Sequence, residues 1–309
     1  MSDRDALNAA IEKYGAFVGL PENDIMIDLA TKIHKAENND FSTSVKVVKA
    51  LKYGPDERNR IDVYSPANAT PSSKLPVALY FHGGGMVSGD NDINPVMYGN
   101  VGYYFASNSC VCILSTYRLL PTARHPDGAN DVTSAMKWAI ENCAAYGGDA
   151  TRITVMGHSA GGSQLGTALW GGYLRDAGIQ EKFACYVFLS AGLWYDVLNP
   201  PTSINMSNYH GTTDIEKIRR EDPLSTFRRA DKETMASWGK MWFFLSEFEF
   251  KEIVEGTVGC MEAYRKTMDK FLLMECIERE NHVSYMYSLG TKGNRVGPRL
   301  LELVTESFK

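Results

Sequence analysis

The sequence lacks an excess of basic charge and lacks the cysteine patterns of metal or disulfide sites. Its 309 residues include 32 lysines and arginines against 37 aspartates and glutamates, a net charge of −5 at pH 7. Nucleic acids and anionic membranes bind clustered positive charge, so this balance argues against both as partners. The six cysteines form no CxxC pair and no Cys–His pair at metal-ligand spacing. We therefore expect reduced cysteines that pack as small apolar side chains.

Long apolar runs are also scarce. Residues 1–15 hold no apolar segment of the kind found in signal peptides, from which we expect a cytoplasmic protein. Residues 153–174 carry no charged side chain and reach the length of a membrane span, but six glycines interrupt them. A strand, a tight turn and a helix explain this segment better, with a break at Gly161-Gly162. We expect no membrane partner.

The order of the apolar runs indicates an α/β fold. Residues 5–34 show helical apolar spacing interrupted at Pro21, and a hairpin of two strands follows at 44–53 and 60–66. From Leu75 onward, buried strands alternate with helical stretches, which predicts a mainly parallel sheet with helices on both faces. The six predicted strands are 76–82, 111–118, 153–159, 185–191, 241–247 and 271–278.

The strand–helix alternation lapses between Asp196 and about Lys240, a stretch that we interpret as a helical insertion. We expect a single domain over residues 1–309, with a cap contributed by about 1–40 and about 196–240. A C-terminal helix predicted at 296–308 has an apolar face that could pack on the sheet or on a partner. The sequence therefore leaves a homodimer open.

The most specific motif is Gly157-His158-Ser159-Ala160-Gly161, which follows a predicted strand and precedes a helical stretch. A serine that attacks substrate must leave the sheet on a sharp, strained turn, and this turn tolerates only very small residues two positions away. The helix that begins there directs free N–H groups and its positive end toward developing negative charge. The motif predicts Ser159 as a nucleophile.

A second motif, His82-Gly83-Gly84-Gly85, directly follows the predicted strand at 76–82. Successive glycines allow the backbone to approach a substrate closely and to present N–H donors without obstruction by side chains. A position at the carboxyl end of a strand, before the serine in the chain, is typical of an oxyanion hole.

A serine nucleophile needs a base, and the sequence has six histidines. His282 is the one that follows both the serine and an acid-bearing strand end, so elimination predicts it as the base. The orienting acid should lie between them at another strand end. Glu247, Glu249 and Asp196 are the candidates.

With these motifs in place, the sequence resembles the hormone-sensitive-lipase-like esterases of the α/β-hydrolase superfamily, which carry an HGGG oxyanion motif. The resemblance covers most of the chain from about Val77 to the C-terminus. The segments that resemble the family patterns YRLxPE…P…D and GGDPxRI and the closing stretch of its cap are residues 117–132, 147–153 and 222–224.

The resemblance implies roles for individual residues. The strand-end acid pattern of the family selects Glu249 over Glu247, with glutamate in place of the usual aspartate. The matching motifs imply that the backbone N–H groups of Gly84, Gly85 and Ala160 form the oxyanion hole. The family needs no metal and no organic cofactor.

This chain departs from the family pattern at three further positions, and these departures bear on substrate preference more than on chemistry. His158 stands where aspartate is commoner, Thr122 where the family has glutamate, and Met86 where a bulky or aromatic residue is frequent. We expect Met86 and Trp194 to contact substrate. The aromatic and apolar residues expected near a cap, which suggest an apolar or aromatic substrate group, are Trp194, Tyr195, Met206, Tyr209 and Trp238.

The function predicted from these residues is a serine hydrolase of the carboxylesterase kind (EC 3.1.1) that cleaves a small ester through an acyl-enzyme. The same serine and oxyanion hole would also serve an amide hydrolase of the arylformamidase type. They would equally serve lactone opening, acyl transfer, or carbon–carbon cleavage or cyclisation. A non-catalytic ligand receptor is the alternative from another class, and that route usually sacrifices a triad member.

Overall fold

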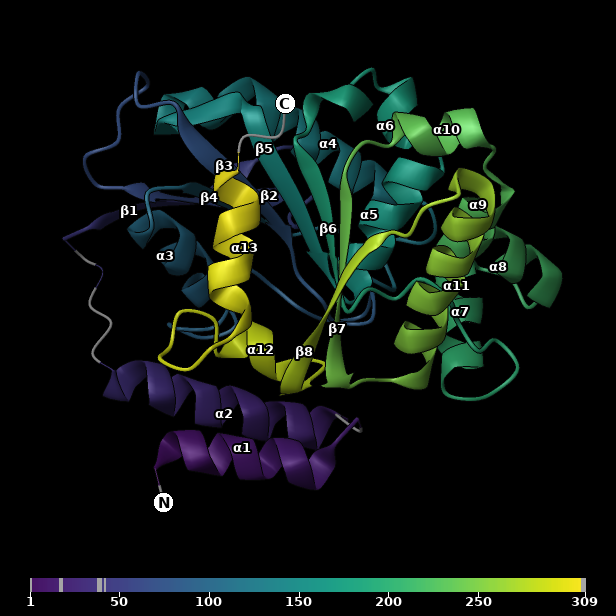
Figure 1. The fold of residues 1–309 in the computed structure, drawn as a ribbon, viewed down its shortest axis with the longest axis horizontal. Helices are drawn as coiled ribbons and strands as arrows, with labels where there is room; N and C mark the ends of the chain where they lie inside the picture. The colour runs from purple at the N-terminus through teal and green to yellow at the C-terminus, as the bar shows by residue number, and fades with distance from the viewer. Residues whose placement is uncertain (1, 17–18, 38–40, 42, 307–309) are drawn as a thin grey trace.

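An eight-stranded, mostly parallel sheet runs through the molecule (Figure 1). The computed structural model describes residues 2–16, 19–37, 41 and 43–306. Strand β1 pairs antiparallel with β2, β2 pairs antiparallel with β4, and the remaining neighbours are parallel. The strand order is β1-β2-β4-β3-β5-β6-β7-β8. The strands are β1 Val45–Lys52, β2 Arg60–Pro66, β3 Leu75–Phe81, β4 Val111–Ser115, β5 Gly148–His158, β6 Cys185–Leu189, β7 Met241–Phe248 and β8 Leu273–Asn281.

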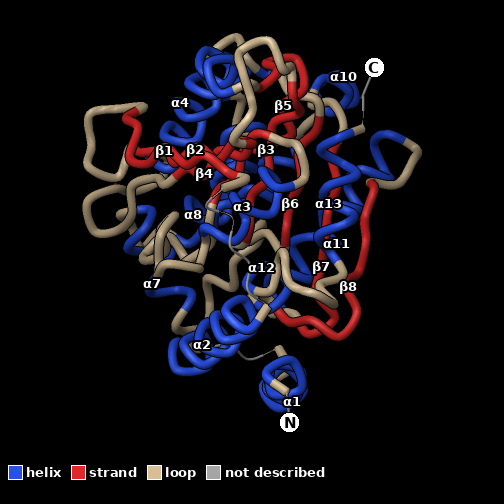
Figure 2. Tube along the Cα trace, turned by 90° about the vertical axis from the view of Figure 1, so that its left-hand side faces the viewer, coloured by secondary structure: helices blue, strands red, loops and turns tan. Residues whose placement is uncertain are grey.

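Helices cover both faces of this sheet, which confirms the predicted fold class (Figures 1 and 2). Short 3₁₀ turns occur at Cys143–Tyr146 and Gln180–Lys182. The α-helices are α1 Asp3–Tyr14, α2 Leu20–Ala36, α3 Gly99–Ser107, α4 Asp127–Asn142, α5 Ala160–Trp170, α6 Tyr173–Asp176, α7 Thr202–His210, α8 Ile215–Glu221, α9 Pro223–Arg229, α10 Lys232–Ser237, α11 Lys251–Met268, α12 Ser284–Tyr287 and α13 Val296–Thr305.

The core lies in two layers, one on each side of the sheet, because side chains alternate along a strand. In β3, Val77 and Leu79 join a cluster with residues of α4, α5, α9, α10 and α11. Ala78 and Tyr80 point to the opposite cluster, which α1, α2, α3, α12 and α13 complete. Packed helices cover both faces of the sheet. The carboxyl ends of the parallel strands therefore remain as the place where a site can be built.

Two expectations about the sheet need correction. The strand predicted at 271–278 is β8, an edge strand rather than a buried one, and Phe271 before it is 69% exposed. Cys276 on β8 is exposed too, whereas the other five cysteines are buried as expected. An edge strand lacks a neighbour on one side, so an apolar run is not sufficient evidence of burial.

The glycine-rich segment 153–174 divides at Ser159 rather than at Gly161-Gly162. Strand β5 ends at His158 and helix α5 begins at Ala160, so both glycines lie inside the helix. No helix in the described part of the chain is long and apolar enough to cross a membrane.

The insertion and the termini are helical. The expected insertion at 196–240 contains α7 to α10. Its first two helices, α7 and α8, pack near the carboxyl end of β5. Helices α9 and α10 instead contribute to the main core, by which we mean the cluster that contains Val77 and Leu79. Helices α1 and α2 pack on each other at one end of the molecule, against β8 and α12 (Figure 2). Helix α13 buries Leu300 and Leu303 on the sheet rather than presenting them to a partner, and residue 308 lies outside the described residues.

Candidate active site

Ser159 sits on the sharp turn between β5 and α5. Its φ of 51° and ψ of −118° lie in a backbone region that residues other than glycine rarely adopt. A Cβ atom on Gly157 would lie 2.7 Å from the Gly161 oxygen, and one on Gly161 would lie 2.3 Å from the Phe81 oxygen. The two flanking glycines are therefore required by contact with backbone atoms, and the turn holds the serine at the edge of the sheet.

His282 and Glu249 reach this serine from the two strands at the end of the sheet. Phe248 of β7 pairs with Asn281 of β8, so the next residue of each chain segment leaves the sheet at the same level. With the imidazole proton on Nδ1, His282 donates to Glu249 Oε1 at 2.7 Å. Its Nε2 accepts from Ser159 Oγ at 2.8 Å. The structure thus brings all three sequence-predicted residues into one hydrogen-bonded chain.

The surroundings of Glu249 keep it ionised. Burial acts to raise the pKa of this carboxyl group, but the His282 charge and hydrogen bonds outweigh it and lower the pKa. Ser246 Oγ donates to Oε2 at 2.8 Å, and the Phe250 N–H donates to Oε1 at 3.0 Å. A buried carboxylate with these partners can orient an imidazole and stabilise its protonated form.

The competing acids point elsewhere. Glu247 is exposed and accepts a hydrogen bond from the Arg279 N–H at 2.7 Å. Asp196 accepts from the Asn199 side chain at 2.9 Å and does not contact His282. The two glutamates are two residues apart, but Glu247 lies within β7, where the register against β8 shifts, whereas Glu249 follows the end of the strand at Phe248. The alternation of a regular strand therefore does not place them on the same side.

Two further histidines, His158 and His82, lie beside the hydrogen-bonded chain of Glu249, His282 and Ser159, and both are buried. The His158 Nε2 is 2.8 Å from the His282 backbone oxygen, so its N–H donates to the loop that carries the base. Burial lowers the pKa of His158 to about 3 and that of His82 to about 4. Both imidazoles are therefore neutral at pH 7, and neither contacts Ser159 Oγ.

The glycine motif after β3 lies directly against the serine. Strands β3 and β5 are neighbours, and a Cβ atom on Gly83 would lie 3.0 Å from Ser159 Cβ. Gly84 has a φ of 129°, and a Cβ atom there would lie 2.1 Å from the Ser88 oxygen. Among the described residues, none accepts a hydrogen bond from the backbone N–H of Gly84, Gly85 or Ala160. Three donors thus remain available beside Ser159.

An apolar cluster lies over the serine. It joins Met86 and Ala160 to side chains of the 195–197 segment and of helices α7 and α8. Of the aromatic residues expected near a cap, Tyr195 and Tyr209 belong to this cluster. Trp194 instead lines a separate groove between α9 and α11, and Trp238 packs in the main core. The cluster consists of Met86, Ala160, Tyr195, Val197, Met206, Tyr209 and Ile218, with Leu120 packed against it.

Sequence reasoning missed two polar residues of α5 that hold these tyrosines. Ser163 hydrogen-bonds the Tyr195 hydroxyl, and Gln164 exchanges hydrogen bonds with the Tyr209 hydroxyl at 2.7 and 2.9 Å. Their position one turn after the nucleophile, in an otherwise apolar helix, is the signal that could have identified them.

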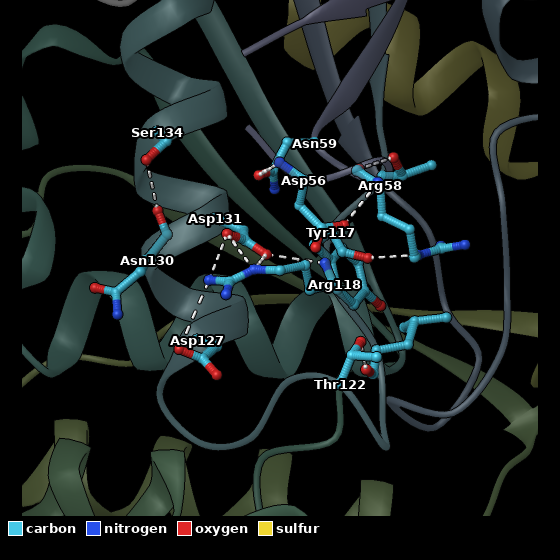
Figure 3. Close-up of polar contacts among 12 residues, drawn as sticks. Asp56, Arg58, Asn59, Tyr117, Arg118, Thr122, Asp127, Asn130, Asp131 and Ser134 are labelled. Atoms are coloured by element: carbon cyan, nitrogen blue, oxygen red, sulfur yellow. Dashed lines mark hydrogen bonds and ion pairs between the residues drawn. The ribbon is translucent and has the colours of Figure 1, made fainter. Parts of the chain in front are cut away.

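Polar contacts tie the segment that follows β4 to helix α4 (Figure 3). The Arg118 guanidinium lies between Asp131 and Asp127, at 2.9 Å from the first and 3.6 Å from the second. The preceding Tyr117 donates its hydroxyl to the His82 oxygen at 2.7 Å. The glycine motif and the loop before α4 are therefore fixed to one another.

A sheet of this order, with a strained serine after β5 and donor glycines after β3, defines the α/β-hydrolase fold. Solved structures agree: esterase B from Lactobacillus Rhamnosis has a TM-score of 0.67 and 13% identity over 93% of this chain and 97% of that chain. The esterase Est22 has a TM-score of 0.66 and 18% identity over 99% and 93%. At these identities the likeness shows the fold alone.

The sequence comparisons find similarity to esterases over part of the chain. Residues 61–187 match the BD-FAE family model. Esterase LipI of Mycobacterium tuberculosis is 33% identical over 119 residues, 38% of this chain and 36% of that protein. An ethyl acetate hydrolase of Pseudomonas putida is 35% identical over 104 residues, 33% of this chain and 31% of that protein. The chain thus spans about a third of the length of these curated relatives. Over these segments the chain is similar to esterases, and its fold is that of the α/β hydrolases.

Proposed function

We propose that the chain is a serine hydrolase that cleaves carboxylic esters, an activity of the EC 3.1.1 class. The observation that carries this proposal is the hydrogen-bonded chain from Glu249 through His282 to Ser159, beside unpaired backbone donors. Relatives that are named as esterases and carboxylesterases support it.

The geometry suits acyl transfer in two halves. Ser159 Oγ attacks the ester carbonyl carbon while His282 Nε2 takes its proton, and the resulting oxyanion accepts hydrogen bonds from Gly84, Gly85 and Ala160. The C–O bond then breaks, and His282 returns the proton to the departing alcohol. Water attacks the acyl-enzyme by the same route, so the acid leaves and Ser159 regains its proton. Glu249 holds the imidazole in the required tautomer throughout.

We propose a small substrate whose acyl or alcohol part is apolar or aromatic. The cluster over Ser159 supports this proposal because its side chains are mainly apolar. The hydroxyl groups of Tyr195 and Tyr209 are engaged by α5, so these residues offer ring surface rather than free hydroxyls. Met86 stands beside Ala160 in that cluster, and we retain it as a substrate contact. We do not propose Trp194 as a substrate contact, because it lines the separate groove between α9 and α11.

We also propose that one domain carries a cap, formed in part by α7 and α8 over the serine. Two further points stay predictions: that about the first 40 residues contribute to this cap, and that the protein is cytoplasmic. A homodimer stays an arrangement that the sequence leaves open. We propose a small-molecule ester as the partner, with no nucleic acid and no membrane.

Turnover of matched esters and amides tests the function. We expect the wild-type chain to hydrolyse p-nitrophenyl acetate and butyrate much faster than the matching p-nitroanilides, and we expect Ser159→Ala to hydrolyse neither. Faster cleavage of the anilides would identify an amide hydrolase. Binding of both without turnover would favour the receptor alternative.

A further inference from the structure

A second cluster of chemically active side chains lies apart from Ser159, where the insertion meets the body of the molecule. His125 lies in the loop before α4, His210 is the last residue of α7, and Glu221 is the last residue of α8. One ligand atom from each residue lies within 4.8 Å of the other two. Among the described residues, this is the one group of three or more histidine, cysteine or acidic side chains so arranged.

The contacts inside the cluster are those of potential ligands. His210 Nδ1 is 2.9 Å from Glu221 Oε2, and the rings of His125 and His210 stack with centroids 4.6 Å apart. The His210 side chain is only 1% exposed, yet its Nε2 has no hydrogen-bond partner within the described chain. Buried polar nitrogens are generally paired. Nε2 can carry the ring proton of a neutral imidazole, which leaves Nδ1 without a proton and able to bind a metal ion together with Glu221 Oε2.

The donor set suits a zinc-like ion. Two imidazoles and a carboxylate form a common three-ligand zinc site, in which water takes the fourth position. Bonds of about 2.0–2.2 Å place neighbouring ligand atoms roughly 3.3 Å apart in a tetrahedral site. The pair of His210 and Glu221 is already that close. His125 is half-buried and its ring would have to rotate to reach the same ion, and half-buried Glu221 is accessible to water.

The charges around the cluster balance. Arg124 lies beside Gly211, and Lys217 is on the same helix as Glu221. Asp127 lies near both His125 and Arg118, and its Oδ2 accepts from the Arg124 N–H at 3.0 Å. A divalent ion would thus meet two carboxylates and two cations, with its own ligands the closest groups.

We propose that His125, His210 and Glu221 bind one divalent transition-metal ion of the Zn²⁺ class, which fastens α7 and α8 to the body of the hydrolase. The body side is rigid because Arg118 and Asp131 brace the loop that carries His125 (Figure 3). On the cap side, Tyr209 precedes His210, and its backbone oxygen accepts from the His125 N–H at 2.8 Å. The ion would therefore fix the helix that places Tyr209 over Ser159.

Calorimetric titration of metal-stripped protein with ZnCl₂, without substrate, tests this proposal. We expect one site per chain and at least tenfold weaker binding in both His125→Gln and Glu221→Gln, which replace half-buried side chains by uncharged amides. Glu216→Gln is the matched control because Glu216 is exposed on the same helix α8. His282→Gln should also keep the site, since it removes the other histidine–glutamate pair.

Thermal unfolding and cobalt spectra give independent readouts. At a hundredfold excess of Zn²⁺ over Kd, we expect the Tm of wild type and of Glu216→Gln to rise by about 4 °C. Co²⁺ should give the visible absorption of a four-coordinate ion in wild type and not in His125→Gln. Unchanged affinity in both site variants, or loss of binding in His282→Gln alone, would overturn the proposal. So would the absence of any zinc binding by folded wild-type protein.

Discussion

Replacing Glu249 by glutamine removes the charge that orients the base while it keeps the size of the side chain. In wild type, the carboxylate accepts the Nδ1 proton of His282 at 2.7 Å and is itself buried. A glutamine amide can present its NH₂ group to Nδ1, which would move the ring proton to Nε2 and leave no acceptor for Ser159 Oγ. The loss should resemble that for other triad acids, about 10³–10⁴-fold in kcat. This corresponds to about 4–5.5 kcal/mol of activation free energy.

Glu247→Gln is the matched control because it makes the same chemical change two residues away. Glu247 is exposed and bonds the Arg279 backbone, so its replacement should change kcat by less than about twofold. The assay is kcat and KM for p-nitrophenyl butyrate, with circular dichroism to confirm that each variant is folded. A larger loss in Glu247→Gln than in Glu249→Gln would refute the assignment of the acid.

Three further perturbations follow from the structure. Gly84→Ala should lower kcat by about 10²–10³-fold because the new Cβ atom would meet the Ser88 oxygen and displace an oxyanion donor. Gly239→Ala is the control: Gly239 also has a positive φ but lies in open space, so kcat should be unchanged. His158→Leu removes the hydrogen bond to the His282 oxygen, so urea titration should show a loss of about 1–3 kcal/mol in unfolding free energy. We also expect kcat to fall at least tenfold with KM unchanged. A kcat equal to that of wild type would contradict a positioning role for His158. Burial raises the pKa of Asp222 to about 6, so the folded state binds more protons than the unfolded state between pH 4 and 6, and stability conferred by the protonated form is lost as pH rises through that range. Asp222→Asn keeps the helix cap and should gain about 2–3 kcal/mol relative to wild type at pH 7.5 but little at pH 4; a Tm difference independent of pH would contradict this.

The sequence predicted the sheet and the serine well because both depend on local patterns. The alternation of strands with helices set the parallel architecture, and the small residues around Ser159 reflect contacts with backbone atoms within a few residues or on the neighbouring strand. The edge position of β8 was beyond this reasoning. Exposure of Phe271 depends on which strands find partners, and no local pattern records that.

The choice among acids and substrate contacts depended on direction rather than on residue type. Glu247 lies within β7 and Glu249 follows its end, so their carboxylates have different partners, and spacing alone could not choose between them. Trp194 and Tyr195 are adjacent, yet one lines a groove against α11 and the other lies over the serine. The cluster of His125, His210 and Glu221 joins residues far apart in the chain, so its assembly required the folded insertion.

Intact-mass analysis after incubation with a fluorophosphonate tests the central claim, an activated Ser159, without assuming any substrate. The serine oxygen displaces fluoride from phosphorus, so one adduct per chain should form on wild type and none on folded Ser159→Ala. Glu249→Gln should react far more slowly than Glu247→Gln. Failure of the folded wild-type chain to form the adduct, or an adduct that persists in Ser159→Ala, would contradict the account.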